Sequence, residues 1–144
     1  TIPAAALYHD DGMAFLTKRP EELLVRIEVP SLAGARASYR KLRRRGAFDF
    51  PVLGVAAWAS FDSAGKVAAA RIVLGAVGSH PKLVEDAAAA LVGGTLEDDQ
   101  LEEAARLASK LAKPLDNTDF TIGWRKDMAP VFVRRALEGL RSVG

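Results

Sequence analysis

The sequence predicts an α+β fold, in which an antiparallel sheet of three to four strands is followed by three helices packed on one face of the sheet. Two observations predict it. Apolar residues alternate with a period of two between residues 22 and 75, and after Gly75 they recur with the helical period of about 3.6. We expect residues 1–144 to form a single domain, with residues 1–20 as an irregular lead-in rich in turn formers.

Each expected strand has its own reason in the sequence. In the first, one face carries only apolar residues (Leu23, Val25, Ile27 and Val29) and the other carries Leu24, Arg26 and Glu28 until Pro30 ends the run, so one face should be largely buried. The second is strongly basic. The third is apolar almost throughout, which is typical of a strand covered on both faces, and a hairpin turn at 62–65 leads into the fourth. The expected ranges are 22–29, 37–45, 52–61 and 66–74.

The three expected helices cover about 81–92, 97–113 and 123–142. Pro81 suits a first helical position, and the second helix is acidic at its start and basic at its end, as the helix dipole favours. Pro130 predicts either a kink in the third helix or a start near Asp127. The side chains expected to be buried are Leu83, Ala87, Ala90 and Leu91 in the first helix and Trp124, Met128, Val131, Phe132 and Leu137 in the third.

Composition excludes several classes of function. The 144 residues include no cysteine, which excludes disulfides, thiol catalysis and thiolate-bound iron–sulfur or zinc sites. The formal net charge of +2 does not indicate a nucleic-acid-binding composition. No apolar run approaches the roughly 20 residues that a membrane helix requires, so no membrane partner is expected. Because the chain starts at Thr1 without an initiator Met, we expect a processed protein or a fragment.

The most informative segment, residues 38–50, places five Arg and Lys side chains within seven consecutive positions. With a period of two, Tyr39, Lys41, Arg43 and Arg45 would share one strand face. This face is either a solvated edge that blocks sheet-to-sheet pairing or a surface held against phosphate or a partner subunit. A stand-alone module that binds an anion or RNA is the alternative function, although single-strand binders use several stacking aromatics and this strand has only Tyr39.

Other candidate sites have simpler explanations. Residues 9–11, His-Asp-Asp, suit a hydrated turn better than a metal site, because three adjacent residues do not easily converge on one ion. His80 suits a capping or exposed role, and residues 75–78 a tight strand-to-helix connection instead of a phosphate loop. The carboxylates of 97–103 are expected to be a solvated helix face, and Arg134, Arg135 and Arg141 a solvated basic helix end. Trp58 and Trp124 are expected to be buried.

Four motifs, in the same order along the chain, resemble those of one protein family. Residues 38–50 resemble its Ser-Tyr-x-Lys-Leu-x-Arg-Arg-x-Ala-Phe-Asp-Phe signature, and residues 71–77 its Arg-Ile-x-Leu-Gly-Gly-Val. Residues 124–126 with 132–137 resemble its closing helix, with Trp124 where the family usually has Tyr, and residues 11–24 resemble the stretch that enters this domain. The family is the C-terminal domain of the FAD-binding subunit of molybdenum-containing hydroxylases, such as carbon monoxide dehydrogenase, 4-hydroxybenzoyl-CoA reductase and xanthine dehydrogenase.

The resemblance implies a non-catalytic domain that braces the flavin, contacts partner subunits during electron transfer and has no activity alone. It implies Lys41 as a flavin contact, with Arg45 and Asp49 as neighbours; an exposed Lys41 and a structural Arg45–Asp49 ion pair are the alternatives. FAD is expected in the intact subunit but not in this chain alone, because the family's Gly-rich FAD-pyrophosphate loops are absent from it. The implied partners are a molybdopterin-binding large subunit and an iron–sulfur small subunit, in a cytoplasmic complex that is itself a homo-oligomer.

Overall fold

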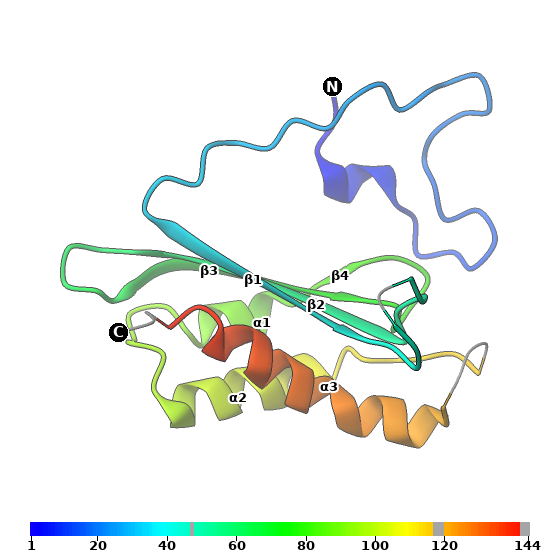
Figure 1. The fold of residues 1–144 in the computed structure, drawn as a ribbon. Helices are drawn as coiled ribbons and strands as arrows, with labels where there is room; N and C mark the ends of the chain where they lie inside the picture. Colours follow the sequence, from blue (N-terminus) through cyan, green and yellow to red (C-terminus); the bar gives the residue numbers. More distant parts are fainter. Residues whose placement is uncertain (47, 117–119, 142–144) are drawn as a thin grey trace.

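The computed structural model describes residues 1–46, 48–116 and 120–141. It contains a four-stranded antiparallel sheet in the order β1-β2-β3-β4, and all three α-helices lie on one side of the sheet (Figure 1). The predicted α+β class is therefore confirmed. The strands are β1 (Ala35–Leu42), β2 (Leu53–Phe61), β3 (Val67–Gly75) and β4 (Lys82–Leu83), and the helices are η1 (Ala4–Leu7, a 3-10 turn), α1 (Glu85–Ala89), α2 (Asp98–Ser109) and α3 (Ile122–Glu138).

The sheet has one covered face and one open face, which we call the helix face and the outer face. In β2, Val55, Ala57 and Ala59 are fully or almost fully buried beneath the helices, whereas Ala56 between them is exposed and Trp58 is half-buried. The expectation that this strand is covered on both faces is wrong, and so is the placement of Trp58 in the core. On its outer side the strand carries Gly54, Ala56, Trp58 and Ser60, so the continuous apolar run does not mean that both faces are covered.

The fourth strand is not the one that the sequence predicts. Residues 22–29 form no strand and every one of them is exposed, although their alternating pattern is present. The sheet is completed instead by the two residues of β4, which pair with Val73 and Leu74 of β3. Residues 80–84 therefore carry a short strand, and the predicted helix start at Pro81 is wrong.

The helices follow the predicted order with different boundaries. Only the five residues of α1 remain from the first expected helix. α2 begins with a capping box, in which Glu97 and Gln100 each accept from the other's backbone N–H. α3 begins at Ile122, one residue before the expected 123, where the Thr121 hydroxyl accepts the Trp124 N–H. The alternative start near Asp127 is therefore wrong. Pro130 lies inside α3, and residue 142 of the expected helix lies outside the described residues.

The core lies between the helix face and the helices, where α1 packs on β3, α3 packs on β1 and β2, and α2 packs on the other two helices. Ala87, Leu91, Phe132 and Leu137 are buried there as predicted. Leu83, Trp124 and Val131 are exposed instead, and Trp124 stacks on Phe120 with the ring centroids 4.4 Å apart. Leu83 lies outside the core because it pairs with Val73, whose neighbours Ile72 and Leu74 take the buried side of β3. Ala90 and Met128 are partly buried.

Candidate functional site

Lys41 lies on the outer face of the sheet. Its neighbours on β1, Arg40 and Leu42, take the opposite side, since Leu42 packs against the core. Arg36 of β1 also lies on the helix face, because its guanidinium donates to the Leu140 carbonyl at 3.0 Å. Lys41 is therefore directed away from the helices, toward the side of the sheet where residues 1–34 run (Figure 1).

Two glycines lie in register beside Lys41. Lys41 pairs with Gly54 of β2, and Gly54 pairs with Gly75 of β3. A Cβ built on Gly54 would stand 2.9 Å from the Tyr39 hydroxyl, so the Tyr39 side chain leans over this glycine. The row therefore presents the Lys41 ammonium, a buried Gly54 covered by the Tyr39 phenol, and Gly75, which carries no side chain.

The Lys41 ammonium makes no hydrogen bond and no ion pair with any residue that the structure describes. The side chain is half-buried at the sheet surface. A lysine in this position has donors to spare, because an ammonium offers three N–H groups. It can therefore donate to a phosphate, a carbonyl or a ring nitrogen brought to the outer face.

Arg45 and Asp49 are engaged with each other. β1 ends at Leu42, so Arg45 lies in the β1–β2 loop. The expectation that Lys41 and Arg45 share one strand face is therefore wrong. The Arg45 backbone N–H donates to Asp49 Oδ2 at 2.9 Å and its guanidinium to Oδ1 at 3.3 Å. These bonds, led by the backbone N–H, lower the pKa of the Asp49 carboxyl. The structural ion pair is thus present and closes the loop.

Sequence reasoning missed the role of Arg125. This side chain is 2% exposed and donates to three backbone carbonyls: Val52 at 3.2 and 3.0 Å, Leu115 at 2.7 Å and Ala76 at 2.6 Å. Burial lowers the pKa of its guanidinium. The residue ties the start of β2, the β3–β4 connection and the chain before α3 together. Its position in the Trp-Arg-Lys motif was the only signal that could have found it.

The other candidate sites have structural roles. Asp10 accepts from Ser79 at 2.6 Å and Lys82 at 2.7 Å, and these bonds, led by the one from Lys82, lower its pKa to about 2. His80 lies half-buried next to them, with Nδ1 3.5 Å from Asp10 Oδ1. In residues 75–78, the carbonyls of Ala76 and Val77 accept from Arg125 and Lys113, so this connection is not a phosphate cradle. Within the described part of the chain, no three His, Cys, Asp or Glu side chains gather as a metal site would require.

The basic end of α3 faces the acidic start of α2 and is not simply solvated. Arg134 contacts Asp98, Glu102 and Glu138, and Arg141 contacts Asp98 at 2.6 Å. Asp98 has a lowered pKa, mainly through its hydrogen bond from Arg141. These ion pairs join two helices and offer no free acid–base pair.

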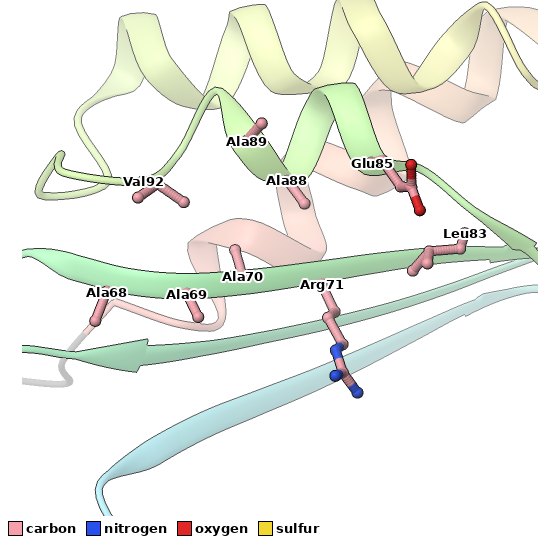
Figure 2. A pocket seen from close by; sticks show the side chains of 9 residues that line it. All are labelled: Ala68, Ala69, Ala70, Arg71, Leu83, Glu85, Ala88, Ala89 and Val92. Carbon is pink, nitrogen blue, oxygen red and sulfur yellow. The ribbon is translucent and has the colours of Figure 1, made fainter. Parts of the chain in front are cut away.

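A shallow hollow between β3 and α1 offers no cluster of polar side chains that could bind or react with a ligand. It is lined mainly by alanines, and the two charged side chains at its border, Arg71 and Glu85, point in different directions (Figure 2). Arg71 extends toward the outer face, where its guanidinium carbon lies 5.9 Å from the centre of the Trp58 ring. Of the helices in residues 1–46, 48–116 and 120–141, none has the length and apolarity for a membrane crossing.

Comparison with known proteins places this geometry in a family. Residues 37–140 match the family model of the CO dehydrogenase flavoprotein C-terminal domain. The carbon monoxide dehydrogenase medium chain of Afipia carboxidovorans is 33% identical over 142 residues, which are 98% of this chain and 48% of that protein. The aldehyde oxidoreductase FAD-binding subunit of Escherichia coli is 34% identical over 97 residues, which are 65% of this chain and 29% of that subunit.

A solved structure agrees with the sequence matches. Reconstituted CO dehydrogenase from Oligotropha carboxidovorans superposes with a TM-score of 0.80 at 33% identity, over 94% of this chain and 47% of that chain. This chain thus spans about half the length of the carbon monoxide dehydrogenase medium chain and of the solved chain. The resemblance first read from the four motifs is confirmed, and the chain belongs to the CO dehydrogenase flavoprotein C-terminal domain family.

Proposed function

We propose that this chain braces the flavin of a molybdenum hydroxylase-type oxidoreductase, acting as the C-terminal domain of its FAD-binding subunit. In this proposal the outer face covers one side of the flavin nucleotide, and Lys41 donates a hydrogen bond to it. The observation that carries the proposal is the Lys41 ammonium on the outer face, which has no intramolecular partner among the described residues and shares its strand face with the Tyr39 phenol. A matched relative is named as an FAD-binding subunit, which supports the choice of ligand.

The residues fit FAD as one wall of its site and not as its main holder. A pyrophosphate needs several clustered backbone N–H donors, and this sequence has no Gly-rich loop of that kind. A side chain at Gly54 would meet Tyr39, so glycine at this position allows the Tyr39 ring to lie over the strand. When bound, FAD would accept and pass on electrons; the residues of this chain bind and orient it and take no part in the electron transfer themselves. We therefore expect no activity from this chain alone.

Arg45 and Asp49 are proposed to support the flavin contact indirectly. Their mutual hydrogen bonds close the loop that follows β1, and this fixes the end of the strand from which Lys41 projects. The Asp49 carboxylate already accepts hydrogen bonds from Arg45 and from the Phe50 N–H, so few of its acceptor positions remain for a nucleotide. In this proposal Lys41 touches FAD, and the other two residues position it.

The remaining assignments concern the whole enzyme. We propose that the intact subunit assembles with a molybdopterin-binding large subunit and an iron–sulfur small subunit, in a cytoplasmic complex that forms a homo-oligomer. The support is that matched relatives are named as a medium chain and as a subunit, which are parts of larger assemblies. The substrate pocket would lie in another subunit, so this chain does not identify the substrate.

Replacement of Lys41 tests the proposal in the intact subunit. Lys41→Ala should weaken FAD retention by about tenfold to a hundredfold, because one charge-assisted hydrogen bond contributes roughly 1.5–3 kcal/mol. Lys41→Arg should restore it only in part, since a planar fork does not reproduce a compact ammonium. FAD affinity is measured by flavin fluorescence during titration of the apoprotein.

Arg40→Ala is the matched control, because Arg40 is an exposed cation on the same strand but on the other side of the sheet. It should leave FAD affinity within about twofold of the parent. The thermal stability of the 144-residue chain should barely change in either variant. If Lys41→Ala lowers stability by more than about 2 kcal/mol while FAD affinity holds, Lys41 is structural and the flavin contact is wrong.

A further inference from the structure

Residues 22–29 have the features of a β-strand without a partner. All eight are exposed, and the backbone N–H and C=O groups from 23 to 31 make no hydrogen bond with any described residue. Backbone groups in a folded protein are nearly always paired with other protein groups or with water. This stretch is extended and lies on the outer side of the sheet, apart from the helices (Figure 1).

The side chains of this segment divide into two unequal faces. Leu23, Val25, Ile27 and Val29 alternate along the chain and are 86%, 88%, 76% and 74% exposed. The opposite face carries Leu24, which is 63% exposed, and the Arg26–Glu28 ion pair at 2.6 Å. Alternation of this kind is typical of a strand with one buried and one solvated face, and β-branched residues are favoured in strands.

Four neighbouring apolar side chains that are all about three-quarters or more exposed form an unusual surface, because large exposed apolar patches usually mark interaction surfaces. The sheet of this chain does not provide the cover, since the segment pairs with none of its four strands. A relative indicates what could cover this apolar face. This chain spans only 48% of the carbon monoxide dehydrogenase medium chain, so that protein has a similar length of polypeptide outside the matched part.

We propose that residues 22–29 form an edge strand on a β-sheet in the other half of the intact flavoprotein subunit, with Leu23, Val25, Ile27 and Val29 against the core of that half. The inference rests on the proposed function, because it requires a subunit that contains more than this domain. It also has a consequence for the flavin site. Residues 29–32 line a groove over Tyr39 and Trp58, so docking of the strand would hold the outer face against the half that grips FAD.

Hydrogen exchange of the intact subunit tests the proposal. At least alternate amides between 23 and 29 should exchange a hundredfold or more slowly than in an unstructured peptide, because an edge strand donates alternate N–H groups to its neighbour. Exchange at the unstructured rate would overturn the proposal. The visible spectrum reports bound FAD independently of hydrogen exchange. Protected amides in a subunit without flavin would contradict only the proposed function. Unprotected amides in a subunit that contains flavin would contradict only this inference.

A pair of variants separates the two faces of the segment. Val25→Asp places a charge on the apolar face and should abolish the protection, whereas Arg26→Asp on the polar face should preserve it. Neither should change the melting temperature of the 144-residue chain, because Val25 is 88% exposed and Arg26 is exposed as well. Equal loss in both variants would contradict the proposal. So would concentration-dependent protection in the 144-residue chain alone, because the partner would then be a second copy.

Discussion

Replacement of Arg125 by Met is expected to destabilise the domain by about 3–5 kcal/mol. The guanidinium is 2% exposed and satisfies the carbonyls of Val52, Leu115 and Ala76 at distances between 2.6 and 3.2 Å. A buried acceptor left without its donor costs about 1–3 kcal/mol, so three of them would cost roughly 3–9. The buried guanidinium has no carboxylate partner, so its removal recovers part of its desolvation penalty. The expected loss of stability therefore lies in the lower part of this range.

Urea denaturation of the 144-residue chain, followed by tryptophan fluorescence, measures this loss. Thermal melting should fall by roughly 6–20 °C, because 1 kcal/mol shifts a domain of this size by about 2–4 °C. Arg125→Lys should lie between the parent and Arg125→Met, since one ammonium cannot reach three carbonyls from three segments. Lys126→Ala, one position further along and exposed, is the control and should change stability by less than about 0.5 kcal/mol.

The result that would refute this reasoning is a change of less than about 1 kcal/mol for Arg125→Met with the control unchanged. The three carbonyls would then be satisfied by other donors. Arg125 would no longer explain how the start of β2, the β3–β4 connection and the chain before α3 are held together.

Two further predictions concern the chain on its own. Purified without the rest of the subunit, it should show no stoichiometric flavin absorption, because one charge-assisted hydrogen bond falls far short of the roughly 8 kcal/mol that micromolar affinity requires. The Asp10 carboxyl should titrate with a pKa of about 2 in an NMR titration, mainly because Lys82 donates to it. Since this pKa is lowered from 3.8, the contribution of Asp10 to stability is full above about pH 4 and is lost as the pH falls through about 2. Asp10→Asn should remove this dependence, and an unshifted pKa would show that the contacts to Ser79 and Lys82 do not form in solution.

The parts of the fold that sequence predicts well are those with long, regular periods. β1, β2, β3 and α2 each repeat a pattern over eight residues or more, and each was found within a few residues of its expected range. β4 has two residues, too few for any period, and Pro81 before it resembles a helix start. The alternating pattern of 22–29 predicts a strand of this sheet, and that prediction is wrong because the segment pairs with none of the four described strands.

The candidate site divides in the same way. Local chemistry predicted the Arg45–Asp49 ion pair as one alternative, because the two residues are close in sequence and opposite in charge. Burial of Arg125 could not be predicted, since its three carbonyls come from distant segments and nothing in the sequence marks a carbonyl as unpaired. Trp58 faces the open side because sheet alternation, not hydrophobicity, decides its direction. The flavin contact of Lys41 stays a prediction.

The distance between Lys41 and the flavin nucleotide in a structure of the FAD-loaded intact subunit tests the central claim most directly. We predict that the Lys41 Nζ atom lies within about 3.2 Å of an oxygen or nitrogen of the nucleotide, with the nucleotide over the Gly54 side of the sheet. A Lys41 ammonium more than about 6 Å from every flavin atom, or a nucleotide on another surface of this domain, would contradict the account.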